Sequence, residues 1–168
     1  PERYLDYKIL FQFDDGEQKW FSVTEDISLI CFHHIPHNLS LAAQIMTEFS
    51  RQNINIDMIS QSAPVGETSD ISFTVSSGDV VSALAVIRSF REQNPSVRPI
   101  VSGGNCKIQL FGEEMRSRPG VAAQAFSLVS SVTNEIMFIT TSEVDISILI
   151  AQHALPAVLD ALKQYYEV

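Results

Sequence analysis

The sequence INIDMISQSAPVGETSDISFTV, which runs from Ile54 to Val75, has the pattern of a β-hairpin. Apolar and polar residues alternate at its start, and successive strand residues point to opposite sides of a sheet. The residues expected on one face are Ile54, Ile56, Met58 and Ser60. Pro64 and Gly66 then supply the turn before a second apolar run. The stretch therefore predicts two antiparallel strands with one buried face.

The same pattern returns about 80 residues later in IMFITTSEVDISILI, from Ile136 to Ile150. The triplet Asp145-Ile146-Ser147 repeats Asp70-Ile71-Ser72, and Ala122-Ala123 repeats Ala42-Ala43. Self-similarity at a fixed period indicates repeated supersecondary units. The second copy is shorter only in its turn, so we expect Ser142-Glu143 to form the tighter one.

Around each hairpin the pattern predicts the order strand, helix, strand, strand, helix, strand. Asn38 or Ser40 can cap the first helix, and Asn94-Pro95 ends the second. The second helix has an apolar stripe of Val81, Leu84, Ala85, Ile87 and Phe90. In the first repeat we expect a strand at 27–32, a loop at 33–38, a helix at 41–52, a helix from 78, a strand at 97–101 and a turn at 102–105. In the second we expect a strand at 107–111, helices at 120–132 and 155–165, and two strands within 136–150.

The second repeat lacks a fourth strand before Val168, which would leave an open hydrogen-bonding edge. Residues 7–13 and 20–23 alternate like strands around a turn at 14–17, so they are available to fill that place. The predicted fold class is α+β, with two units of antiparallel sheet and the first unit inserted into the second. The predicted bounds are 1–23 for the completing strands, 24–101 for the first unit and 102–168 for the second.

Composition limits the function classes. The net charge is −9 with only 11 Lys and Arg, so nucleic acid and anionic membrane are excluded as partners by repulsion. The sequence has neither an apolar run of bilayer length nor a signal peptide, and we expect a cytoplasmic protein. Cys31 and Cys106 lie in apolar strand-like runs and are expected to be buried, reduced thiols.

Four motifs resemble a known family. They are MRSRPGVAA from Met115, INIDMISQS from Ile54, TSDISFTV from Thr68 and TSEVDIS from Thr141. In their order along the chain they are similar to the C-terminal regulatory region of aspartokinase, and the resemblance covers about Val23 to the C-terminus. It implies tandem ferredoxin-like ACT domains that pair as a homodimer and bind lysine or threonine as feedback inhibitors of aspartate phosphorylation. In that family a catalytic kinase domain precedes these domains, and this chain has no phosphate-cradling glycine loop leading into a helix. We therefore expect the aspartokinase catalytic domain as a partner in cis or in trans.

The resemblance also implies a set of effector-binding residues. A free amino acid needs amide groups for its carboxylate and oxygen acceptors for its ammonium, and a helix N-terminus supplies the amides. The implied residues are Pro36, His37, Ser40, Asp57, Gln61, Asp70, Met115, Arg116, Ser117, Pro119, Gly120, Glu135, Ile136, Thr141, Ser142 and Glu143. His37, Leu39 and Ser40 stand where the family usually has Asp, Pro and Gly. We therefore expect weak binding at most in the loop from Pro36 to Ser40.

Other readings of the sequence are less well supported. His33, His34 and His37 could share a metal ion, but no Cys or carboxylate lies beside them in the sequence, so we favour a solvated loop. Gly103-Gly104 before Lys107 is a weak phosphate-site look-alike between two strands and is read as a turn. We expect no catalytic residue, metal or cofactor. The alternative function is a stand-alone ACT-domain dimerisation scaffold that has lost its effector.

Overall fold

The computed structural model describes residues 7–12, 18–36, 39–112, 115 and 120–166. Its contacts divide the fold into two units. Unit 1 consists of the described parts of Pro1–Glu25 and Gly104–Val168, and unit 2 is Asp26–Gly103. Two long strands, β2 (Gln18–Pro36) and β5 (Pro99–Gly112), each run from one unit into the other.

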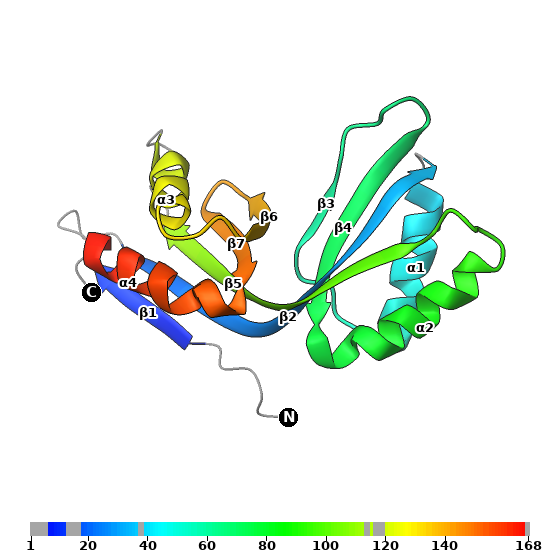
Figure 1. Ribbon diagram of the computed structural model, residues 1–168, viewed down its shortest axis with the longest axis horizontal. Coiled ribbons are helices and arrows are strands. Elements are labelled where there is room, and N and C mark those ends of the chain that lie inside the picture. The colour runs from blue at the N-terminus through cyan, green and yellow to red at the C-terminus, as the bar shows by residue number, and fades with distance from the viewer. Residues whose placement is uncertain (1–6, 13–17, 37–38, 113–114, 116–119, 167–168) are drawn as a thin grey trace. The chain divides into compact units, whose positions relative to one another are not determined.

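Unit 2 has the element order that the first repeat predicts (Figure 1). After β2 come α1 (Leu39–Arg51), β3 (Ile59–Gln61), β4 (Thr68–Ser76), the 3-10 turn η1 (Ser77–Asp79) and α2 (Val80–Arg91), and β5 follows. The strands are hydrogen-bonded in the order β3-β4-β2, with β5 beyond β2. Antiparallel pairing joins β2 to β4 and β3 to β4.

The core of unit 2 lies between these strands and the two helices. Phe73 of β4 is at its centre, with its ring centroid 5.8 Å from that of Phe32 on β2 and 5.7 Å from that of Phe49 on α1. All three side chains are buried, and Ala83, Val86 and Ile87 of α2 join them. Apolar burial of this kind is the main stabilising term of a small domain.

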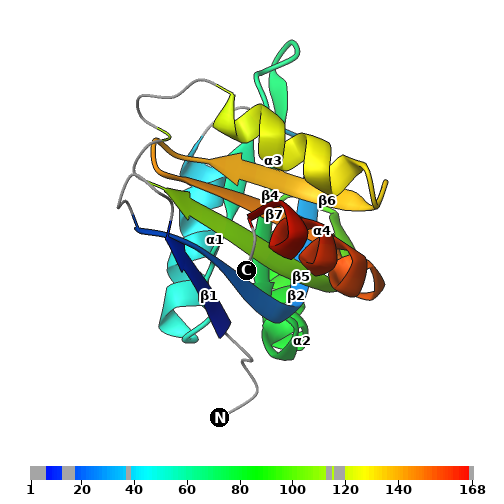
Figure 2. The ribbon, with the colours of Figure 1, turned by 90° about the vertical axis from the view of Figure 1, so that its left-hand side faces the viewer.

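Unit 1 repeats the arrangement with the N-terminal strands as its last members. From the second half of β5 the chain forms α3 (Val121–Ser130), β6 (Ile136–Thr141), β7 (Asp145–Ala151), the 3-10 turn η3 (Gln152–Ala154) and α4 (Leu155–Tyr166). The strand order is β6-β7-β5-β2, and β1 (Tyr7–Gln12) pairs with β2 (Figure 2). Phe21 and Val23 of β2 are fully buried in the same core as Ile108 and Leu162. The predicted fold, with the first unit inserted into the second, is confirmed.

The predicted breaks within β2 and β5 are wrong. Residues 20–23 and 27–32 belong to one strand, in which Asp26 has a φ of 55°. The predicted loop at 33–38 is strand as far as Pro36, and the predicted turn at 102–105 lies inside β5. β2 pairs with β1 along one half and with β4 along the other, and these partners keep it extended. Glycines such as Gly104, with a φ of 69°, let a strand bend without ending it.

The predicted hairpin exists, but its first strand is short. β3 covers only Ile59–Gln61, opposite Phe73, Ser72 and Ile71. Just before it, the Met58 amide donates to Thr74 Oγ1 at 3.0 Å, and the Thr74 amide donates to the Met58 carbonyl at 2.9 Å. The Thr74 hydroxyl therefore takes the place of a backbone carbonyl as the acceptor for the Met58 amide. Regular strand pairing begins one residue later, at Ile59.

Two details of the helices also differ from prediction. α1 begins at Leu39, so Ser40 lies inside the helix and its Oγ accepts a bond from Gln44 Nε2 at 3.3 Å instead of capping. Asn38 lies outside the described residues. On α2, Val81 is 81% exposed and Ala85 is exposed as well, because the buried face is formed by Ala83, Val86 and Ile87. Among the described residues, every helix is too short or too polar to cross a bilayer.

Candidate functional site

In unit 1 the end of β5 is hydrogen-bonded to the β6–β7 turn. The Gly112 amide donates to the Val144 carbonyl at 2.8 Å, one step beyond the last ladder pair of Phe111 and Asp145. The segment that leads to α3 therefore leaves the sheet beside the turn that contains Thr141, Ser142 and Glu143. Met115 packs partly buried against the core of unit 1. Arg116, Ser117 and Pro119 lie outside the described residues.

Gly120 is the N-cap of α3 and has a φ of 96°, in the left-handed region. Among the described residues, no atom apart from those of its neighbours in the chain lies within 4 Å of the position that a Cβ would occupy there. The first amides of a helix lack intrahelical partners and carry partial positive charge. This helix start can therefore receive a carboxylate.

The β6–β7 turn is organised by a residue that the sequence analysis did not select. Asp145 Oδ2 accepts from Gln109 Nε2 at 2.6 Å, and Asp145 Oδ1 accepts from the Ser142 hydroxyl. Ser142 Oγ in turn accepts from the amides of Val144 and Asp145, each at 3.2 Å. The hydroxyl of Ser142 is thus committed to the turn. The repetition of Asp70-Ile-Ser as Asp145-Ile-Ser was the signal that could have identified Asp145.

Glu135 and Ile136 lie at the other end of β6. The Ala151 amide donates to the Glu135 carbonyl at 3.2 Å, and Ile136 is opposite Ile150. The Glu135 carboxylate contacts His153 Nε2. Thr141 is five residues along β6 from Ile136, which corresponds to roughly 17 Å. Within unit 1 the structure therefore does not bring Glu135 together with the β6–β7 turn.

In unit 2 the corresponding residues gather where β2 ends. Pro36 is opposite Thr68, and Gln61 Nε2 donates to Ser69 Oγ at 3.1 Å. The exposed Ser40 lies in the first turn of α1, and His37 lies outside the described residues. Asp57 is not part of this group. Its amide donates to the Thr74 carbonyl, and Thr74 is four residues along β4 from Asp70, a separation of roughly 13 Å.

Asp70 has close partners on β2. Its Oδ1 accepts from the His34 amide at 2.9 Å, and its Oδ2 lies 3.1 Å from His33 Nδ1. The amide bond first and the imidazole second hold the pKa of Asp70 below its usual value. Sequence reasoning placed His33 and His34 in a loop without a nearby carboxylate, so it missed this pairing. Among the residues that the structure describes, no three His, Cys, Asp or Glu side chains form a metal-binding group.

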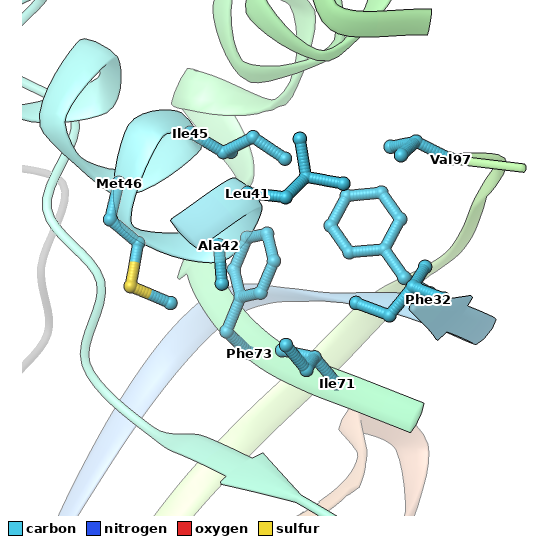
Figure 3. Close-up of a pocket in the computed structure, with 9 residues that line it drawn as sticks. Phe32, Leu41, Ala42, Ile45, Met46, Ile71, Phe73 and Val97 are labelled. Carbon is cyan, nitrogen blue, oxygen red and sulfur yellow. The ribbon is translucent and has the colours of Figure 1, made fainter. Parts of the chain in front are cut away.

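A small cavity lies in the apolar core of unit 2. Figure 3 shows Leu41 and Ile45 of α1 facing Phe32, Ile71 and Phe73 across it. Its volume is about 10 Å³ and its lining is entirely apolar. A cavity of this size holds a single water at most, and an apolar lining keeps it dry. It cannot accept an amino acid.

The two units of the fold repeat one α+β arrangement of strands and helices. The model of the ACT domain family matches residues 33–89 and 108–166, and the chain belongs to this family.

Known relatives refine the assignment. The aspartokinase of Bacillus sp. strain MGA3 is 27% identical over 143 residues, which are 85% of this chain and 35% of that protein. The aspartokinase of Pseudomonas aeruginosa is 27% identical over 166 residues, 94% of this chain and 40% of that protein. The chain thus spans little more than a third of the length of these relatives.

Solved structures support the same assignment. The ligand-free regulatory subunit of aspartate kinase from Thermus thermophilus superposes with a TM-score of 0.78 at 28% identity, covering 86% of this chain and 95% of that one. Aspartate kinase from Synechocystis gives a TM-score of 0.81 at 29% identity, covering 88% of this chain and 27% of that one. The resemblance to the regulatory ACT region of aspartokinase is confirmed.

Proposed function

We propose that this chain binds an amino acid of the lysine or threonine type and thereby regulates an aspartate kinase. The observation that carries the proposal is its correspondence to nearly the whole of a regulatory subunit, 95% of the Thermus thermophilus chain. The open left-handed Gly120 at the start of α3 supports it, because that backbone can approach a ligand carboxylate. The ligand would be read by the segment from Met115 to Gly120 and by the turn from Thr141 to Glu143.

The catalytic kinase domain is the proposed partner, either on the same polypeptide or on a separate chain. A homodimer is proposed as well, and the protein is expected to work in the cytoplasm. Among the described strands, β3 and β6 each have a hydrogen-bonded neighbour on one side only. Ile59 on β3 is 46% exposed, and Met137 and Ile139 on β6 are 41% and 38% exposed. Such edges favour pairing with another chain.

The second candidate is a dimerisation scaffold that has lost effector binding. One observation favours it: Ser142 in unit 1 and Asp70 in unit 2 already have hydrogen-bond partners. Ser142 is bonded within its turn, and Asp70 accepts bonds from His33 and His34. The replacements at His37, Leu39 and Ser40 act in the same direction in unit 2.

Calorimetric titration with lysine, threonine, methionine and diaminopimelate separates the two candidates. The regulatory proposal expects saturable heat with lysine or threonine that is strongly reduced in Gly120→Val, because a β-branched side chain disfavours the left-handed backbone. Gly78→Val is the matched control, since Gly78 has no positive φ and an open Cβ position. Absence of heat with all four amino acids, in a chain that sediments as a dimer at micromolar concentration, would favour the scaffold.

A further inference from the structure

The β6–β7 turn has only Glu143 and Val144 between the paired positions Ser142 and Asp145. The Ser142 amide donates to the Asp145 carbonyl at 2.9 Å, which is one of the two backbone bonds that such a pair exchanges. Two-residue hairpin loops favour type I′ or II′ turns, which need a positive φ at the first loop residue or at both. Within the described chain, neither Glu143 nor Val144 has a positive φ. The backbone of this turn is therefore not of the kind that closes a hairpin by itself.

Side chains complete the turn in place of the second backbone bond. The Asp145 amide donates to Ser142 Oγ at 3.2 Å, so the hydroxyl takes the position of the Ser142 carbonyl as acceptor. The Val144 amide donates to the same Oγ, also at 3.2 Å. An oxygen that accepts two amides directs its own hydrogen elsewhere, and this one donates to Asp145 Oδ1. Asp145 therefore sets the direction of the Ser142 hydroxyl, and with it the two amides that the hydroxyl holds.

Asp145 is itself held from the sheet. Gln109 of β5 lies diagonally across the ladder from Asp145, whose direct partner is Phe111, and its Nε2 donates to Asp145 Oδ2 at 2.6 Å. Gln109 and Asp145 are both half-buried, which strengthens a hydrogen bond to a carboxylate. The carboxylate thus links the turn on one side to β5 on the other, and both donors are neutral groups.

The corresponding aspartate of unit 2 is used differently. The pairing of β2 with β4 shifts register between Phe32 and Ile35. His33 and His34 together oppose the single residue Asp70, which is the definition of a β-bulge. The Asp70 carboxylate is engaged by this bulge. The β5–β7 ladder keeps a regular register up to its last pair, so the aspartate of unit 1 can serve the turn instead.

We infer that Asp145 is a positioning residue for the amino-acid effector of unit 1. It sets the backbone of the turn from Thr141 to Glu143, acting through Ser142 and not through contact with the effector. This inference rests on the proposed function, which assigns that turn to the effector. Thr141 and Glu143 are exposed, whereas the Ser142 hydroxyl and the Asp145 carboxylate are bonded to each other. The effector therefore meets the backbone and the exposed side chains of the turn.

Amide hydrogen exchange of the protein without any amino acid tests the hold on the turn. Asp145→Ala should speed exchange of the Val144 and Ser142 amides about tenfold, because the Ser142 hydroxyl loses its acceptor. Asp145→Asn should stay within about twofold, because its oxygen can accept from Ser142 while its NH₂ group donates to a rotated Gln109 amide. Asp160→Ala removes an exposed acid from α4 of the same unit and should match the unaltered protein. Unchanged rates in Asp145→Ala would overturn the inference.

Gln109→Ala is the second variant, and it decides if Asp145→Ala does not fold. It removes the donor from β5 and leaves Asp145 bonded to Ser142. The Val144 and Ser142 amides should then exchange about threefold faster, because the carboxylate is free to move away from the hydroxyl. Rates equal to those of the unaltered protein would show that the turn does not depend on the link to β5, and the inference would be overturned.

Titration with lysine and with threonine tests the role in effector binding. Asp145→Ala should raise the Kd about tenfold, and Asp145→Asn should keep it within about twofold. Ser142→Ala should raise the Kd about as much as Asp145→Ala, and the double variant no further, because both substitutions remove the same bond. If Asp145→Asn loses binding while its Val144 amide stays protected, the carboxylate contacts the effector and the inference is overturned. If neither amino acid binds the unaltered chain, the proposed function fails and the role in effector binding falls with it, while the exchange rates separately show whether Asp145 holds the turn.

Discussion

Gly112 and Val144 are joined by a 2.8 Å hydrogen bond from the Gly112 amide to the Val144 carbonyl. This bond extends the β5–β7 ladder past the pair of Phe111 and Asp145, to the point where β5 ends. It fixes the sheet end of the segment before α3, and Gly120 fixes the helix end through its left-handed backbone. These two backbone features set the described ends of the proposed carboxylate site.

Gly120→Ala should lower the free energy of unfolding by about 1 kcal/mol through backbone strain alone. The φ of 96° disfavours any residue with a Cβ, and in the part of the chain that the structure describes the added methyl meets no atom within 4 Å beyond its chain neighbours. Urea denaturation measures the difference. Gly78→Ala, at a glycine without positive φ, is the control and should be neutral or slightly stabilising. Equal effects of the two substitutions would contradict the strain argument.

Ile87→Ala should cost about 2–5 kcal/mol, because it removes a side chain that is 1% exposed in the core of unit 2. Val81 is on the same helix but 81% exposed, and Val81→Ala should change the unfolding free energy by less than about 0.5 kcal/mol. Thermal or urea unfolding of both variants tests which face of α2 is buried. A larger loss in Val81→Ala would mean that this face is covered by a partner.

The Asp70 carboxylate should contribute to the acid sensitivity of unit 2. Its pKa is held below the ordinary value of 3.8, first by the His34 amide and then by His33. The contribution to stability is therefore present above that value and is lost as the pH falls through the lower folded pKa. Asp70→Asn should accordingly lose less stability than the unaltered protein between about pH 5 and about pH 2. Glu67→Gln serves as the control. If Asp70→Asn and the unaltered chain lose the same stability over this pH range, the result would count against the hydrogen bond from the His34 amide to Asp70.

The fold could be predicted because its main signals are local and repeated. Ile54, Ile71 and Phe73 follow strand periodicity, and the second copy around Ile146 gave the unit its order and its insertion. The continuity of β2 and β5 could not be predicted in this way. Asp26 and the Gly103-Gly104 pair are turn signals by themselves, and only the long-range pairing with neighbouring strands keeps the chain extended through them.

The same distinction between local and long-range signals applies to the site residues. Gly120 could be selected only through the family resemblance, because spacing alone favours an ordinary strand-to-helix turn at this position. The partners of Asp70 could not, since the bulge at His33 and His34 depends on the register between strands that are 36 residues apart. Asp145 was within reach of sequence reasoning through the repeated Asp-Ile-Ser triplet.

Cys106 should make the protein less stable at alkaline pH. Its side chain is fully buried, and burial first and the Glu25 carboxylate second raise the pKa of the thiol to about 12. In the unfolded chain a thiol ionises near pH 9, so above that pH the unfolded state releases a proton that the folded state keeps. Stability must then fall as the pH rises from about 9 toward about 12, by about 1 kcal/mol at pH 10.

The measurement is urea unfolding at about pH 8 and about pH 10 under reducing conditions. Cys106→Ala should be less stable at the lower pH because it leaves a small cavity, but its loss between the two pH values should be smaller by about 1 kcal/mol. Cys31→Ala removes the half-buried thiol and keeps Cys106, so it should retain the alkaline loss. If Cys106→Ala and the unaltered protein lose the same stability on going to pH 10, the thiol ionises in the folded chain and its burial in unit 1 is incomplete.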